Sequence, residues 1–150
     1  MNHLKKELYQ QCQAYVQRSI EAAQQAIEDA QNASDDDTKS SAGDKYETGR
    51  AMMEQETDRN MAQLKEANKL KIILNKINPE ALFEEALPGS LVITDNGNFY
   101  IAIGAGVLTI NNENYFSISA ASPIGLKLKG LKEGQNFKLM DKHYLIKRIF

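Results

Sequence analysis

The sequence predicts an α+β protein in which a long antiparallel helical hairpin precedes a small antiparallel β domain. Three observations support this prediction. Residues 1–78 are rich in alanine, glutamine, glutamate and lysine, and their apolar positions recur every three or four residues, as in amphipathic helices. From residue 90 the apolar positions alternate instead, as they do in half-buried strands. Seven of the nine glycines and all three prolines lie at or after Pro79, where the first pattern ends.

Length and composition limit the classes of protein to which the chain can belong. With 150 residues, 42% of them apolar, it can form one domain or two small units with a core. The net charge of −2 gives no general attraction to nucleic acid or anionic lipid. A single cysteine excludes an internal disulfide framework, and no segment has the length of a signal peptide or a membrane span. We therefore expect a cytoplasmic protein without a membrane partner.

Residues 1–78 are expected to form two helices that pack against each other. In the first helix a stripe of apolar or small residues follows one face, at Tyr9, Cys12, Val16, Ile20, Ala23, Ile27 and Ala30. The second helix has a stripe of the same period, at Met53, Thr57, Met61, Leu64, Ala67, Leu70, Leu74 and Ile77. Because neither stripe can be buried alone, the helices are predicted to fold back on each other as an antiparallel coiled coil.

The break between the two helices is acidic. The stretch "DDDTKSSAGDKYETG" carries five carboxylates within thirteen positions, at Asp35, Asp36, Asp37, Asp44 and Glu47. Like charges repel one another, so clustering these acids does not stabilise the fold. Helix capping accounts for one or two of them at most. Two interpretations stay open, an ordinary solvated turn and a functional acidic tip at residues 34–47.

Residues 90–150 are expected to form six short antiparallel strands and one short helix, after a linker at residues 79–89. Turn residues between alternating segments predict three β-hairpins, at 90–103, 107–119 and 136–149. The helix is predicted between the second and third hairpins. Its N-cap would be Ser122, its first residue Pro123, and glycines at 130 and 134 would follow its end.

The stretch "SPIGLKLKGLKEGQNF", residues 122–137, resembles the carboxy-terminal signature of the bacterial Gre transcript cleavage factors. That signature runs Ser-Pro, a hydrophobic residue, a small residue, and later two glycines four residues apart before a strand. The chain matches it without a gap at Ser122, Pro123, Ile124, Gly125, Leu128, Gly130 and Gly134. The order of the predicted elements extends the resemblance over nearly the whole chain.

The resemblance implies a monomeric regulator of transcription elongation that binds RNA polymerase. Gre factors insert their helical hairpin through the secondary channel of the polymerase, and their carboxy-terminal domain, of the FK506-binding-protein (FKBP) shape, docks on the channel rim. Contact with the RNA and DNA of the elongation complex would be indirect. The residues expected to contact the polymerase here are Ser122, Pro123, Ile124, Gly125, Lys127, Lys129 and Gly130.

The same resemblance assigns a catalytic role to the tip acids, within the polymerase. Gre tip acids help to hold a Mg²⁺ ion and a water molecule for the hydrolysis of backtracked RNA, and carboxylate oxygens suit this hard cation. The chain itself would be no enzyme and would bind no cofactor on its own. The residues that correspond are Asp36, Asp37, Asp44 and Glu47, of which Asp44 and Glu47 would hold the shared Mg²⁺.

The tip also departs from the Gre pattern. When Tyr46 is aligned with the tyrosine of the family motif, Lys39 stands at the position of its aspartate and Ala42 at that of its glutamate. In the second motif, Leu126 and Gln135 replace an arginine and an aspartate. Two alternatives therefore stay open. One is a channel-binding inhibitor without cleavage activity, and the other is a non-catalytic coiled-coil interaction protein.

Other residues with reactive or ligating side chains form no recognisable site in the sequence. Cys12 lies on a helix stripe without an activating partner, and His3 and His143 lie near opposite ends of the chain without metal-ligand spacing. Prolyl isomerase activity would rest on shape alone. The last 24 residues are basic, but no aromatic residues alternate with the basic ones, so direct nucleic-acid binding has weak support. We expect these lysines to meet an acidic protein rim or passing phosphates.

Overall fold

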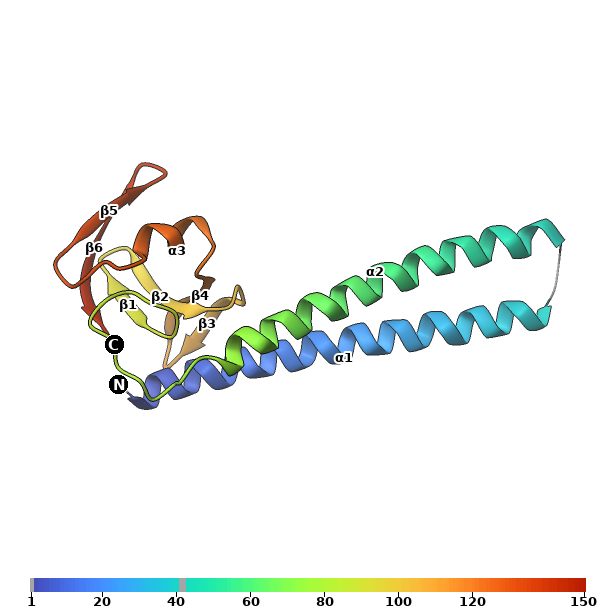
Figure 1. Cartoon of the computed structure of the whole chain (residues 1–150), viewed down its shortest axis with the longest axis horizontal. Helices are drawn as coiled ribbons and strands as arrows, with labels where there is room; N and C mark the ends of the chain where they lie inside the picture. Colours follow the sequence, from blue (N-terminus) through green and yellow to red (C-terminus); the bar gives the residue numbers. More distant parts are fainter. Residues whose placement is uncertain (1, 41–42) are drawn as a thin grey trace. The chain divides into compact units, whose positions relative to one another are not determined.

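The structure is a computed structural model that describes residues 2–40 and 43–150, with the side chains of residues 3–33 and 51–150. Its elements are α1 (Asn2–Ser40), α2 (Gly43–Asn75), β1 (Leu91–Thr94), β2 (Gly97–Ala102), β3 (Gly106–Ile110), β4 (Glu113–Ser119), α3 (Pro123–Leu128), β5 (Asn136–Leu139) and β6 (Lys142–Ile149) (Figure 1). The protein is therefore α+β, with two long helices before a six-stranded, mostly antiparallel sheet and one short helix. No helix in the described ranges is long and apolar enough to cross a membrane.

The chain divides into two compact units. The first unit contains Met1–Tyr15 and Lys71–Phe150, and the second contains Val16–Leu70. The first unit thus joins the start of α1 and the end of α2 to the whole sheet. The boundaries expected near residues 78 and 89 both lie inside it.

The two long helices extend far into the acidic stretch. α1 continues to Ser40 and α2 begins at Gly43, so Asp36 and Asp37 belong to α1 and Asp44 and Glu47 to α2. Residues 34–40 contain neither glycine nor proline, the two residues that most strongly end a helix. The helical part of the chain therefore includes most of the polar break that the sequence indicated.

The second unit consists only of α-helix in its described residues, and few of its side chains are buried. The buried ones are Val16, Ile20, Ala23, Asn60 and Ala67. The stripe predicted for α2 is wrong at one position, because Met61 is 55% exposed whereas Asn60 is 7% exposed. The buried and half-buried residues of α2 occur at 53, 57, 60, 64, 67, 70 and 74, in steps of three or four. A step of four residues from Thr57 would place Met61 on the inward face. The actual step is three residues, and it places Asn60 there.

The strands are ordered β3-β4-β2-β1-β6-β5 in the sheet. The three hairpins that the sequence predicted are present, as the antiparallel pairs β1–β2, β3–β4 and β5–β6. The expectation of an entirely antiparallel sheet is wrong, because β2 and β4 pair in parallel. The chain leaves β2 for the edge strand β3 and returns by a tight hairpin, so β4 fills the place between β3 and β2. Turn residues determine which two strands pair within a hairpin. The pairing of one hairpin with the next depends on the tertiary structure.

The two faces of the sheet are covered by different elements. One face carries the main core, formed by Ala86, Val92, Phe99, Ile101, Leu128, Tyr144, Ile146 and Ile149, with α3 packed over it. The start of α1 packs on the other face, where Leu8 and Tyr100 are fully buried. There the sulfur of Cys12 lies 3.3 Å from the hydroxyl oxygen of Ser117 in β4. Cys12, expected to pack against the second helix, therefore also contacts the sheet.

A buried lysine fixes the start of α1 within the first unit. Lys5 is 0% exposed, and its ammonium donates hydrogen bonds to the main-chain oxygens of Ala81 and Phe150. The same nitrogen lies 4.7 Å from the centre of the Phe83 ring, and the electron-rich face of the ring attracts its positive charge. Burial lowers the pKa of Lys5 to about 8, because the charged form loses its hydration. This side chain joins three segments that are far apart in the sequence.

Candidate functional site

The resemblance motif, residues 122–137, contains the N-cap of α3, the whole of α3 and the chain that follows it as far as the start of β5. Ser122 has extended backbone angles and is the N-cap: its hydroxyl oxygen accepts the N–H of Gly125 at 3.1 Å. The same hydroxyl donates to the carbonyl of Ser119 at 2.6 Å. Pro123 occupies the first helical turn, where a missing N–H costs nothing, as the sequence predicted. The cap therefore ties α3 directly to the end of β4.

Glycine at position 125 is required by close packing. A Cβ atom there would lie 2.3 Å from the carbonyl oxygen of Ser119 and 2.9 Å from that of Ala120. Both are main-chain atoms, so a larger residue would displace α3 from the end of β4. Among the apolar residues of the motif, Leu128 belongs to the main core and Ile124 packs against it.

The far end of α3 is tied to the segment before β1. Gly130 has φ +79, and its N–H donates to the carbonyl of Ala86 at 2.9 Å. In return the N–H of Ala86 donates to the carbonyl of Leu131 at 2.8 Å. This pair of hydrogen bonds holds residues 86–88 beside α3.

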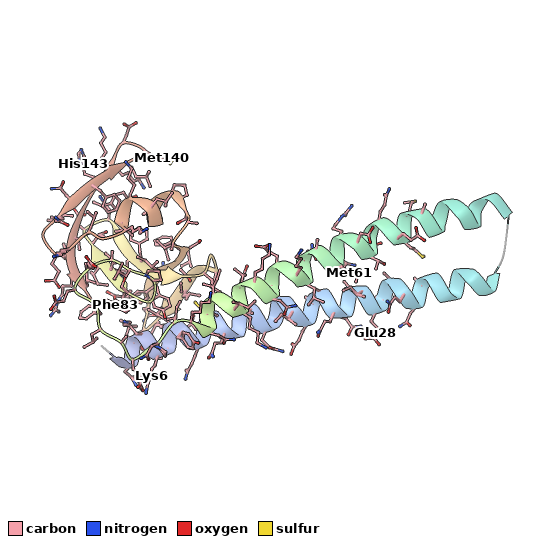
Figure 2. The ribbon with its side chains drawn as sticks, in the orientation of Figure 1. Lys6, Glu28, Met61, Phe83, Met140 and His143 are labelled. Carbon is pink, nitrogen blue, oxygen red and sulfur yellow. The ribbon has the colours of Figure 1, made fainter. Side chains whose placement is uncertain are left out.

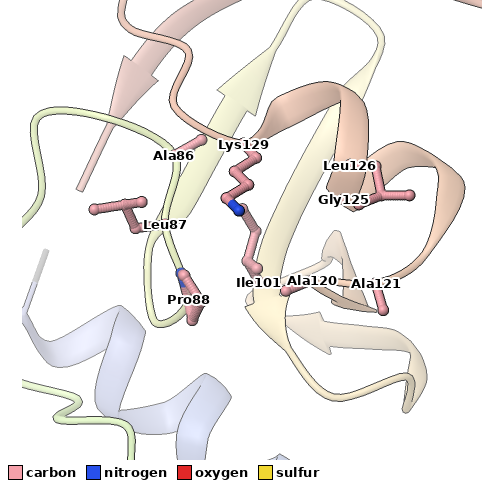
Figure 3. A pocket seen from close by; sticks show the side chains of 9 residues that line it. All are labelled: Ala86, Leu87, Pro88, Ile101, Ala120, Ala121, Gly125, Leu126 and Lys129. Atoms are coloured by element: carbon pink, nitrogen blue, oxygen red, sulfur yellow. The ribbon is translucent and has the colours of Figure 1, made fainter.

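The tied segments enclose an apolar pocket of about 310 Å³ (Figure 3). It is lined by Ala86, Leu87, Pro88, Ile101, Ala120, Ala121, Gly125, Leu126 and Lys129. Leu126 at its edge is 64% exposed, and Lys129 supplies the one charged side chain of the lining. The lining holds no carboxylate, imidazole, thiol or hydroxyl group. Its chemistry is thus suited to binding an apolar group beside an anionic one.

The structure brings the predicted partner-contact residues together in one place. Ser122, Gly125 and Lys129 lie in the cap, in the packing contact and on the pocket wall, respectively. Lys127 is exposed in the last turn of α3. Leu87 and Pro88 form the opposite wall and are not among the residues predicted from the sequence. Both lie in the segment 79–89, which the sequence indicated only as a linker.

The predicted tip acids belong to the second unit, at the ends of α1 and α2. The side chains of Asp36, Asp37, Asp44 and Glu47 lie outside the described residues, as do those of Lys39 and Ala42. The expected Mg²⁺ ligands therefore stay a prediction. Elsewhere, in the described part of the chain, no group of three or more histidine, cysteine, aspartate or glutamate side chains could hold a metal ion.

Cys12, His3 and His143 have reactive or ligating side chains that formed no recognisable site in the sequence. Burial raises the pKa of the Cys12 thiol, which keeps it protonated and unreactive. His3 is exposed and lies 3.6 Å from the carboxylate of Glu7. His143 is exposed on β6. None of these three side chains lines the α3 pocket.

Comparisons of the chain with protein-family models, with curated proteins and with solved structures found no match. A function for the chain is therefore inferred from its own residues and from the resemblance of residues 122–137.

Proposed function

We propose that the chain is an RNA polymerase-binding regulator of transcription elongation. In this proposal the sheet unit docks on the rim of the secondary channel, and the helical unit carries its acidic end into the channel. The observation that carries the proposal is the segment Ser122–Gly130, which contains α3 and its N-cap. It resembles the Gre signature, and Gly125 and Lys129 within it line the apolar α3 pocket.

The α3 pocket supports docking on a protein surface. Its wall residues Leu126 and Pro88 are exposed, and protein interfaces have an apolar centre surrounded by polar residues. Lys129, with the neighbouring Lys127, would then pair with carboxylates of the polymerase. An apolar side chain of the rim would enter the pocket between α3 and residues 86–88.

The finer features of the fold belong to the same proposal. We propose that the helical unit is an antiparallel coiled coil, since its inward positions on α2 follow steps of four and three. We also propose an FKBP-like shape for the sheet unit, because a short helix packs over one face of a curved, mostly antiparallel sheet.

The tip acids fit the chemistry of a Mg²⁺ ion in donor type. Asp44 and Glu47, with Asp36 and Asp37 nearby in sequence, would supply carboxylate oxygens to an ion shared with the polymerase. Such an ion lowers the pKa of a bound water and so prepares it to attack a phosphodiester. Lys39 and Ala42 stand where Gre factors have acids, and this observation favours the alternative in which the chain occupies the channel without cleavage.

The proposal is tested with stalled, backtracked elongation complexes from the source organism. We expect the wild-type chain to change RNA shortening or elongation and the Asp44→Ala/Glu47→Ala variant to have lost this effect. Glu66→Ala, an exposed acid far from the tip in sequence, serves as the matched control. RNA shortening would identify a cleavage factor, and slower elongation without shortening an inhibitor. Equal effects of the wild type and the double variant would refute the role of the tip.

Docking is tested separately in a binding assay with the core polymerase. Leu126→Asp places a charge at the edge of the α3 pocket and is expected to weaken binding at least tenfold. Leu82→Asp changes a leucine that is equally exposed but does not line the pocket, so it should bind like the wild type. Unchanged binding by Leu126→Asp would place the docking surface elsewhere.

A further inference from the structure

The turn of the β5–β6 hairpin contains a residue that its backbone geometry does not favour. Met140 and Asp141 have φ values of +50 and +66, in the left-handed region. The β3–β4 turn has nearly the same geometry, with φ +52 at Asn111 and +66 at Asn112. Asparagine tolerates this conformation well, whereas a long apolar side chain costs about 1 kcal/mol or more. The sequence therefore has the expected residue in one turn and an unfavourable residue in the other.

Burial does not explain Met140 either. Its side chain is 89% exposed, the highest value among the exposed large hydrophobic residues of the described chain. Figure 2 shows it at the free end of the β5–β6 hairpin. A residue held in a sparsely populated backbone conformation that packing does not require motivates a hypothesis of function, here a contact with another molecule.

The hairpin holds this side chain on a rigid stem. Phe137 of β5 and Tyr144 of β6 stack at 4.8 Å between ring centres, and Tyr144 also packs edge-on against Phe99 in the core. At the base, the carboxylate of Asp95 accepts the N–H of Leu145 at 2.8 Å. The turn is therefore positioned by packed aromatic rings and not by its own residues.

Positive charge surrounds the turn and continues along β6. The cations of the hairpin are Lys138, Lys142, Lys147 and Arg148. Three acidic side chains lie near these four cations. Asp141 lies 4.0 Å from Lys138, and the carboxylates of Asp95 and Glu133 accept main-chain N–H groups of β6. The hairpin thus has a positive balance, although the whole chain has a net charge of −2.

We propose that the β5–β6 hairpin binds in a groove of duplex DNA, with Met140 as an apolar wedge and Lys138 and Lys142 against the phosphates. Two-stranded ribbons fit DNA grooves, and architectural proteins insert apolar side chains such as methionine between base steps. Protein–DNA interfaces are rich in positive charge, whereas the centres of protein interfaces are depleted of it. A narrow ribbon with one apolar side chain among cations matches a protein–DNA interface. This contact is independent of the proposed polymerase docking, which uses the α3 pocket.

The test measures binding of the full chain to a short fluorescein-labelled DNA duplex by fluorescence anisotropy, between about 50 and about 200 mM potassium chloride. Met140→Asn gives this turn the residue found in the β3–β4 turn. We expect the variant to melt at a higher temperature than the wild type and yet to bind DNA about tenfold more weakly. A loss of binding with a gain in stability cannot come from misfolding.

Charge is tested with Lys138→Gln/Lys142→Gln, which should reduce the steepness of the negative slope of log K against log salt by about 2. The control Lys65→Gln/Lys71→Gln removes the same charge from exposed positions of α2 and should leave the slope unchanged. The proposal is overturned if the wild type does not bind at the lowest salt, or if Met140→Asn binds as well as the wild type. It is also overturned if the control pair lowers the slope equally, or if a polyglutamate peptide competes as well as DNA, which would indicate an acidic protein partner.

Discussion

Gly125 connects the sequence motif to the α3 pocket at the scale of a single residue. Its missing side chain lets α3 lie against the carbonyls of Ser119 and Ala120, and this contact forms one end of the α3 pocket. The motif residues Ser122 and Pro123 act on the same contact, since they start the helix at that point. A family signature is therefore explained here by packing, before any partner is considered.

Replacement of this glycine is expected to destabilise the sheet unit. Gly125→Ala should lower the free energy of unfolding by about 2 kcal/mol, because the added methyl group meets main-chain oxygens that cannot move aside. Gly104→Ala is the matched control, since a Cβ atom at Gly104 has nothing within 4 Å. Urea unfolding followed by circular dichroism measures both. Equal stability of the two variants would show that α3 shifts without cost.

Lys5 makes the stability of the protein depend on pH in the alkaline range. Its pKa is lowered from 10.5 to about 8 by burial, so between these values the unfolded chain binds more protons than the folded one. Stability contributed by Lys5 therefore rises with pH from about 8 to about 10.5, by at most about 1.4 kcal/mol per pH unit.

The Lys5→Met variant isolates this effect from other groups that titrate at the same pH. We expect the difference in unfolding free energy between wild type and variant to shift in favour of the wild type as pH rises from 8 to 10. Lys6→Met is the control, because Lys6 is half-exposed and pairs with Glu80 at 2.9 Å. A Lys5→Met curve that runs parallel to that of the wild type would contradict the lowered pKa of Lys5.

At the scale of the element, α2 has a polar residue on its inward face. Asn60 is 7% exposed, and its side-chain NH₂ group has no hydrogen-bond partner among the described residues. A buried donor without a partner costs about 1–3 kcal/mol. Buried asparagines in paired helices are known to favour one register over others at the expense of stability. The helical unit is therefore less stable than its alanine-rich sequence allows.

Replacement of Asn60 by leucine is expected to stabilise the helical unit. Asn60→Leu removes the unpaired donor and adds buried apolar surface, so the free energy of unfolding of the helices should rise by about 1 kcal/mol. Met61→Leu changes the exposed neighbour and should have almost no effect. The helical signal at 222 nm during urea unfolding reports both. A loss of stability in Asn60→Leu would show that the asparagine oxygen makes a bond that outweighs the unpaired NH₂ group.

The strands show which parts of an element can be predicted. Bounds came within a residue or two because each hairpin has its own turn residues, such as Asn111 and Asn112 between β3 and β4. Within the third predicted hairpin, residues 136–149, the turn lies at Met140-Asp141. This placement matters, because it puts Met140 at an exposed left-handed position.

At the scale of the whole molecule, each long helix belongs to two units. Its inner end packs with the sheet, where Tyr9 donates to the carbonyl of Leu74 at 2.9 Å and Cys12 contacts Ser117. The periodic stripe predicted one continuous interface along the helices, since periodicity identifies an apolar face but not its partner. The α3 pocket was predictable in part, from Ser122 to Gly130. Its other wall required the pairing of Gly130 with Ala86.

The amino-acid order alone determined the two long helices, the three hairpins and the capped start of α3, because each depends on residues a few positions apart. Only the tertiary structure decided that β4 lies parallel to β2, that Lys5 is enclosed by Ala81, Phe83 and Phe150, and that Asn60 and not Met61 faces inward. These features depend on which surfaces meet across long sequence distances. Local preferences do not encode that choice, since burial of the same apolar face can be satisfied by more than one partner.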